Sequence, residues 1–268
     1  MDSSLIEPLE EKVILSSTKK ESPSKLSNYR SLHLWMLIPM LVMQAGIFRD
    51  YWGDFSENAW SVHVHYWTGT IWYVYLIIQP YYATHGQMAK HRTNGIIGMF
   101  IAGAVCLTAF SMMHRDMAAA ELALVQPDRF GPFKPWFFYG VAAVEIVMIT
   151  AFGFAVIKSI LHRKKFESHA WWLISTVFII MMPALGRGLQ AFVFATTSSQ
   201  WPNIDIMSSL YVATAMIIAM VLLGAWKYKK FRHPATYLAI AVNLFNLFLE
   251  PIGRSETIQE FLKMVIKG

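Results

Sequence analysis

Long apolar runs separated by short polar breaks dominate the chain after residue 31. A helix needs about 20 mostly apolar residues to cross a bilayer. The first and last runs are the least regular, because the first contains Pro39 and the last contains Asn243, Asn246 and Glu250. The pattern predicts an all-α, polytopic transmembrane helix bundle over residues 32–252. Seven spans are expected, at residues 32–48, 66–83, 95–113, 136–158, 170–194, 206–226 and 235–252.

The composition favours a membrane protein and excludes several other classes. Hydrophobic residues make up 55% of the chain and charged residues 15%, with a mean hydropathy of +0.39. A soluble domain carries about 25% charged residues. The single cysteine, Cys106, excludes a disulfide framework and is expected to be a packing residue of the third span. The net charge of +6 arises in loops, so no nucleic-acid partner is expected.

The two ends of the chain differ from the apolar body. Residues 1–31 are polar and mixed in charge, which fits neither a secretory signal nor a transit peptide, and we expect a disordered cytoplasmic tail. Residues 253–268 are expected to form a short amphipathic tail, where Thr257 and Glu260 make a capping-box pattern. Residues 116–125 are rich in helix formers and are expected to form a separate interfacial helix in the longest loop.

The distribution of lysine and arginine predicts the orientation of the spans. Cytoplasmic loops of membrane proteins carry an excess of these residues. Alternate loops hold most of the chain's 23 such residues, which places the N-terminus inside and the C-terminus outside. In a bacterial cell this would be a multi-pass protein of the inner membrane. The positively charged segments are residues 1–31, 83–94, 158–168 and 227–233.

Two ionisable residues lie deep within the predicted spans. Glu145 lies about 20 Å along its helix from Lys158, near the middle of the bilayer or beyond it. Arg187 lies about 27 Å along its helix from His169, and it would either reach outward or turn back to pair with Glu145. Such groups are costly in lipid and usually face the bundle interior. Together with Gln190 they predict either a buried structural ion pair or a polar site for a substrate or an ion.

Histidines at matched depths predict a second kind of site. His91 opens the third span and His169 opens the fifth, both on the inner side, while His65 and His114 are matched in the same way on the outer side. Two histidines on facing helices are the ligands of b-type haem, and Arg92 would pair with a haem propionate. Gly95 and Gly98, which follow His91, would allow close approach of a porphyrin, although this spacing is also typical of close helix packing.

Other chemistries lack their motifs. The chain has no histidine block of the kind that membrane di-iron enzymes use, no H-E-x-x-H zinc motif, and no nucleotide-binding glycine motif. A retinal protein needs a lysine in its last span, and residues 235–252 contain none.

Three stretches carry a family resemblance: residues 65–80 from a histidine to a proline, HRTNG at 91–95, and residues 169–187 from a histidine to an arginine. They resemble a mainly bacterial family of multi-pass membrane proteins of unknown function, marked by an H-R-x-x-G motif. The resemblance covers about residues 60–195 and implies a helical membrane bundle without an established activity. The chain is more distantly similar to transmembrane cytochromes b, in which four consecutive helices each supply a histidine. Here the span at 136–158 has none, which leaves His91 and His169 as the implied haem ligands.

Three functions follow as hypotheses. The first is a b-type haem protein that passes electrons between a quinone or another redox partner and an acceptor, with His91 and His169 as the iron ligands. The second is a transporter or small-molecule-binding membrane protein that uses Glu145, Arg187, Gln190 and His65. The third is a non-catalytic scaffold or assembly subunit.

Overall fold

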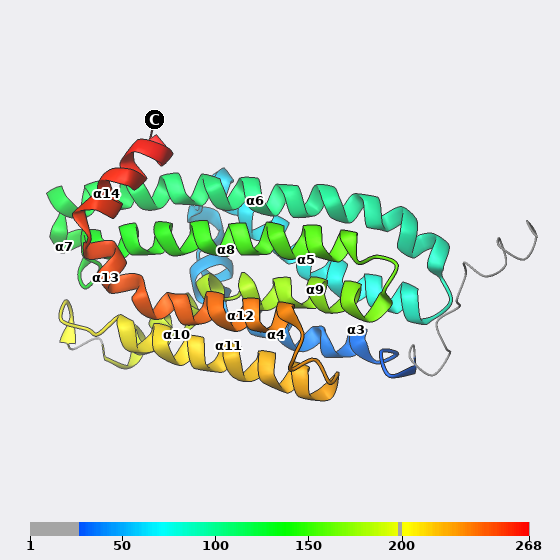
Figure 1. Ribbon diagram of the computed structural model, residues 1–268. Helices are drawn as coiled ribbons and strands as arrows, with labels where there is room; N and C mark the ends of the chain where they lie inside the picture. The colour runs from blue at the N-terminus through cyan, green and yellow to red at the C-terminus, as the bar shows by residue number, and fades with distance from the viewer. Residues whose placement is uncertain (1–26, 198–199, 268) are drawn as a thin grey trace, which may run out of the picture.

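The computed structural model describes residues 27–197 and 200–267, and this part of the chain is a bundle of helices without a β-strand. Figure 1 shows the long helices running side by side. The predicted all-α fold is confirmed. The prediction for residues 1–31 falls mostly outside the described residues. The main helices are α3 (Leu32–Trp35), α4 (Leu37–Gly46), α5 (Trp60–Thr84), α6 (Met88–Val125), α8 (Pro135–Leu161), α9 (Phe166–Ile179), α10 (Met182–Thr196), α11 (Met207–Lys227), α12 (Pro234–Phe245), α13 (Leu249–Arg254) and α14 (Glu256–Leu262).

Within the described residues, five helices are long and apolar enough to cross a membrane. They match five of the predicted spans. The other two predicted spans correspond to the shorter apolar helix Leu32–Gly46 and to α5, a 25-residue helix that carries His63, His65 and Gln79 among its apolar side chains. The five candidate spans are Met88–Val125, Pro135–Leu161, Phe166–Thr196, Met207–Lys227 and Pro234–Arg254.

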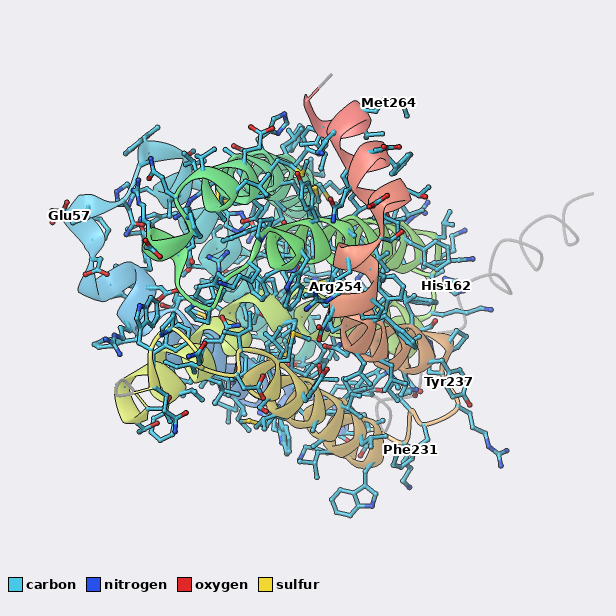
Figure 2. The ribbon with its side chains drawn as sticks, turned by 90° about the vertical axis from the view of Figure 1, so that its left-hand side faces the viewer. Glu57, His162, Phe231, Tyr237, Arg254 and Met264 are labelled. Carbon is cyan, nitrogen blue, oxygen red and sulfur yellow. The ribbon has the colours of Figure 1, made fainter. Side chains whose placement is uncertain are left out.

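The surface of the bundle is apolar, as a lipid-facing surface must be. Phe100 and Leu107 of α6 and Trp226 of α11 each expose at least 70% of their area. Figure 2 shows Tyr237 of α12 at the edge of the bundle, on the opposite side from Glu57. Large exposed apolar patches mark contacts with a partner or a membrane. The periphery therefore supports an integral membrane protein.

The helix α6 differs from the expectation. It runs without interruption from Met88 to Val125, and its 38 residues give a length of about 57 Å. Residues 116–125 are therefore the last turns of α6 and not a separate interfacial helix. The C-terminal helix α14 and the π-helix η5 (Lys263–Lys267) cover this end, where Leu262 and Ile266 pack against Met113 and Met117. The N-cap of α14 is Ser255, so the capping box predicted at Thr257 does not form.

The predicted fifth span is broken in its middle. The helix α9 ends at Ile179 and α10 begins at Met182, followed by Pro183, which lacks an N–H group. The break frees carbonyl groups at the end of α9, and side chains from other helices satisfy two of them. Tyr73 Oη donates to Val177 O at 2.9 Å, and Asn243 Nδ2 donates to Phe178 O at 3.1 Å. The break is therefore held open by contacts with α5 and α12.

The last predicted span is also interrupted. A short 3-10 helix, η4 (Asn246–Phe248), separates α12 from α13. The helix α13 then lies so close to α8 that a Cβ atom on Gly253 would fall 2.0 Å from Trp136 O.

The first predicted span ends at a close helix crossing. A Cβ atom on Gly188 of α10 would lie 2.6 Å from Gly46 Cα, at the end of α4. After this crossing the chain forms the π-helix η1 (Phe48–Gly53), which Arg49 Nη1 fastens to α10 by donating to Ala191 O at 3.1 Å. The segment η1 thus lies over the C-terminal half of α10.

Candidate functional site

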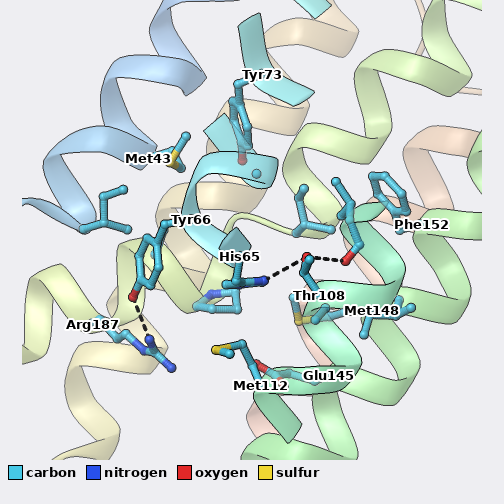
Figure 3. Close-up of a pocket in the computed structure, with 18 residues that line it drawn as sticks. Met43, His65, Tyr66, Tyr73, Thr108, Met112, Glu145, Met148, Phe152 and Arg187 are labelled. Atoms are coloured by element: carbon cyan, nitrogen blue, oxygen red, sulfur yellow. Dashed lines mark hydrogen bonds between the residues drawn. The ribbon is translucent and has the colours of Figure 1, made fainter. Parts of the chain in front are cut away.

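Two cavities meet toward the end of the bundle at which α7 (Pro127–Phe130) and α13 lie, and four residues line both of them. The first, which we call the outer cavity, has a volume of about 370 Å³. The second, which we call the deep cavity, has a volume of about 100 Å³ and is drawn in Figure 3. Ligand sites in proteins have volumes of about 300–1,000 Å³, so the outer cavity alone is large enough for a small solute. The shared residues are Glu145, Met148, Pro183 and Arg187.

Glu145 lies on α8, about 24 Å from the inner end of that helix at Leu161. Only 8% of its surface is exposed, and its Oε2 has no hydrogen-bond partner. A buried carboxylate oxygen without a partner is costly unless a ligand, water or proton satisfies it. Glu145 is therefore placed as the sequence predicted, and it faces both cavities.

Arg187 lies on α10 and lines both cavities, and Figure 3 shows its guanidinium beside the Tyr66 hydroxyl. Its Nη1 donates to Tyr66 Oη on α5 at 2.8 Å. The Tyr66 ring stacks on Tyr51 of η1, with centroids 4.5 Å apart and planes 2° apart. Tyr51 Oη in turn lies 3.0 Å from His63 Nδ1. These aromatic rings hold the guanidinium in place from the outer side.

Arg187 and Glu145 do not form the ion pair that the sequence suggested. Salt bridges form between Lys230 and Glu167 and between Arg254 and Glu250, but none joins Arg187 to Glu145. The reason lies in the helix break after Ile179, which sets the direction of α10, and in the Tyr66 hydroxyl, which binds the guanidinium. A half-buried cation and a buried carboxylate thus line one cavity without a salt bridge between them.

The structure adds two polar residues that sequence reasoning missed. Asp116 of α6 is nine-tenths buried and its Oδ2 has no hydrogen-bond partner. Asn246 of η4 is 2% exposed, and neither its Oδ1 nor its Nδ2 has a partner. Both line the outer cavity together with Gln190, whose Nε2 makes a long bond of 3.4 Å to Ile206 O. Asn246 was visible as a polar residue in an apolar span, but Asp116 was assigned to a loop.

The outer histidines are separated by the fold. His65 does not precede the second span but lies inside α5, where it lines the deep cavity and its Nδ1 is 3.3 Å from Thr108 Oγ1 (Figure 3). His114 is exposed, and its ring packs against Phe110 of its own helix. The two histidines predicted as an outer pair therefore have different surroundings.

The inner histidines do come together. The rings of His91 on α6 and His169 on α9 have centroids 6.0 Å apart and planes at 87°. His169 Nδ1 lies 2.8 Å from Ser159 Oγ and 3.0 Å from Ser159 O, which orients its ring. His91 Nδ1 is buried without a partner, and so are both amide atoms of the nearby Gln79.

No protein-family model, no curated protein and no solved structure matches this chain.

The other residues predicted around haem have different surroundings. Arg92 is exposed, and neither of the two cavities described above is lined by His91 or His169. Gly98 packs against α5, since a Cβ atom there would lie 2.1 Å from Tyr75 Oη, whereas Gly95 has open space around it. Close helix packing thus accounts for Gly98. The described residues contain no group of three or more side chains that could hold a metal ion.

Proposed function

We propose that this protein is a multi-pass membrane transporter that binds a small polar solute in the outer cavity. One observation carries the proposal: the buried Glu145 and the half-buried Arg187 line the same cavity without forming a salt bridge with each other. Ionisable groups at membrane depth are usually functional, because a purely structural role rarely offsets their cost. The unpartnered atoms of Asp116 and Asn246 add hydrogen-bonding groups for a solute.

The two broken helices support the same function. Transporters commonly bind their solutes where transmembrane helices are discontinuous near the middle of the membrane. The α9–α10 break brings Pro183 and Arg187 to the cavities, and the break at η4 brings Asn246 to the outer cavity. A bundle with only a structural role has no need for polar backbone breaks at this place.

For the topology we propose seven spans, with the N-terminus inside and the C-terminus outside. Seven helical segments follow the predicted spans, with α3 and α4 forming the first and α5 the second. In Figure 1 the turns after α5, α8 and α11 lie at one end of the bundle, and α7 (Pro127–Phe130) and α13 lie at the other. The first end carries the excess of lysine and arginine, which supports a cytoplasmic position for it.

Thiol labelling tests whether the cavity admits solutes. We would replace Met148, which lines both cavities, in a Cys106→Ala background and treat sealed vesicles with a charged, membrane-impermeant methanethiosulfonate. Thr150, two residues along α8 and exposed on the bundle surface, is the matched control. Thiols react as thiolates, which form in water but not in lipid. We expect the Met148→Cys variant to react at least about tenfold faster than Thr150→Cys. Equal or slower labelling would show that the cavity is closed to solutes and the proposal wrong.

A second candidate function is haem binding, and the contact between His91 and His169 is the observation that favours it. A haem iron held there would supply one-electron transfer, and Ser159 would orient the His169 ring through its Nδ1. The imidazoles fit as a ligand pair, but the exposed Arg92 and the packing of Gly98 against Tyr75 do not build a porphyrin pocket around them.

An absorbance spectrum separates the two candidates. The protein would be purified in detergent after expression with added haem, and spectra recorded before and after reduction with dithionite. A Soret band with sharp reduced bands, lost in His91→Ala and His169→Ala, would establish haem. A colourless protein would remove this candidate and leave the transporter proposal untouched.

A further inference from the structure

The buried charges of the outer cavity do not balance. Two buried carboxyl groups, those of Asp116 and Glu145, line it, whereas Arg187, which is half-buried, is the only basic side chain of the lining that is not exposed. Asp50 and Arg115 also line the cavity, but both are exposed and carry opposite charges. A net charge in a low-dielectric site is expensive unless a counter-charge accompanies it. One additional positive charge in the cavity would therefore balance its two carboxylates.

The uncharged polar groups of the cavity point to a ligand and not to an internal network. Asn246 is almost fully buried, and both polar atoms of its amide lack a partner. Asp116 Oδ2 and Glu145 Oε2 are likewise buried and lack a hydrogen-bond partner. Buried polar atoms in proteins are normally hydrogen-bonded. Three unpartnered acceptor oxygens from three helical segments line one cavity, which suits a ligand that donates several hydrogen bonds.

Part of the lining of the cavity is aromatic. Four phenylalanines line it, and they pack edge to face or tilted against one another, with centroids 4.9 Å apart for Phe133 and Phe137 and 5.5 Å apart for Phe130 and Phe138. Aromatic faces attract cations and also bury apolar groups. The same end of the bundle already shows this contact, since the Arg254 guanidinium lies 4.7 Å above the Trp136 ring.

We infer that the outer cavity takes a small organic monocation, an ammonium group on an apolar body. The ammonium would donate to Asp116, Glu145 and the Asn246 amide oxygen, and the apolar body would lie against the phenylalanines. Arg187 would then balance the second carboxylate. This inference rests on the proposed function, because it names the class of solute for the same cavity.

Three probes with the same phenyl group, similar size and different charge test the inference. They are 2-phenylethylammonium, its neutral counterpart 2-phenylethanol, and the anion 3-phenylpropanoate. The full-length chain would be purified in detergent, and its thermal unfolding midpoint measured against the concentration of each probe. A ligand that binds the folded state raises the midpoint according to its dissociation constant. We expect the ammonium to bind at least about tenfold more tightly than either of the other two.

Charge-neutralising variants locate the binding site. Asp116→Asn and Glu145→Gln remove a charge while keeping nearly the same shape, and each should weaken ammonium binding about tenfold or more. Glu57→Gln, which neutralises an exposed carboxylate on the same side of the bundle, is the matched control and should leave the affinity unchanged. The comparison of the three probes on the unmodified chain does not depend on any variant folding.

The other outcomes overturn the inference in distinct ways. If 2-phenylethanol binds as tightly as the ammonium, the carboxyl pair already holds a proton and needs no cation. If 3-phenylpropanoate binds instead, and Arg187→Gln abolishes that binding, the cavity is a site for anions and the proposed function survives. If none of the probes binds, the solute class is wrong, and thiol labelling at Met148 decides separately whether the cavity admits solutes at all.

Discussion

Arg187 of α10 donates a hydrogen bond of 2.8 Å to the hydroxyl of Tyr66 on α5, a residue 121 positions earlier in the chain. This bond holds the half-buried guanidinium where the two cavities meet. It also connects the cation to the stacked pair of Tyr66 and Tyr51, and so to η1. The neutral Tyr66 hydroxyl thus fixes the position of the positive charge. The carboxyl groups of Asp116 and Glu145 remain available to bind a ligand in the outer cavity.

Removing the Tyr66 hydroxyl should disturb the site more than the fold. In Tyr66→Phe the ring stack on Tyr51 can remain, but the guanidinium loses its partner. We expect the free energy of unfolding, measured by denaturant titration in mixed micelles, to fall by about 1–3 kcal/mol. Tyr237→Phe, at an exposed position, should change it by less than about 0.5 kcal/mol. Equal effects of the two variants would show that the Arg187–Tyr66 bond contributes nothing.

The crossing of α4 and α10 should not tolerate a methyl group. A Cβ atom on Gly188 would lie 2.6 Å from Gly46 Cα, so Gly188→Ala must push the helices apart and should cost about 1–3 kcal/mol. Gly103→Ala is the matched control, because no atom lies within 4 Å of its Cβ position. Alanine has the higher helix propensity, so this control should be neutral or stabilising by up to about 1 kcal/mol. Unfolding midpoints that rank the two variants in the opposite order would contradict the crossing.

Asn243 should stabilise the break between α9 and α10. Its Nδ2 donates to Phe178 O, one of the carbonyls left free at the end of α9. Asn243→Leu keeps a similar volume but removes this donor, and should lower the free energy of unfolding by about 1–3 kcal/mol. Leu244→Asn, at the exposed neighbouring position, serves as the comparison for a change of polarity on α12. Faster hydrogen exchange at residues 178–184 in Asn243→Leu alone would show that the break itself has loosened.

Acid should destabilise the inner end of the bundle through His233. Burial, together with the charges of Lys230 and His162, lowers the pKa of His233 from 6.5 to about 4. Its Nδ1 accepts a hydrogen bond from Ala235 N at the start of α12, which the protonated ring cannot do. Between these two pKa values the unfolded chain binds more protons than the folded chain. The stabilisation is therefore complete above pH 6.5 and is lost as the pH falls toward 4.

Comparison with His233→Asn isolates this effect. Asparagine keeps a helix-capping acceptor but does not titrate. Between about pH 7.5 and pH 4.5, the unfolding midpoint of the unmodified chain should fall further than that of the variant. Parallel curves would mean that His233 does not contribute to the acid sensitivity.

Glu145, Arg187 and Gln190 were recognisable from the sequence because each is a polar residue within a long apolar run. Whether Glu145 pairs with Arg187 was not predictable, because the answer depends on the helical phase and on the bend after Ile179. Tyr66 gave no signal at all, because tyrosine is common near the ends of membrane helices. Asp116 was misplaced because α6 continues for about three turns beyond residue 113, where the predicted span ends.

The sequence by itself determined that this is a helical membrane protein, where its apolar segments lie, and which charges fall inside them. Those properties are local: they depend on run length and on the cost of a charge in lipid. Only the tertiary structure decided which side chains share a cavity. Asp116, Glu145, Arg187 and Asn246 come from four helical segments, and their meeting depends on two helix breaks and on a glycine crossing. These depend on contacts between residues far apart in the chain, which no local pattern records.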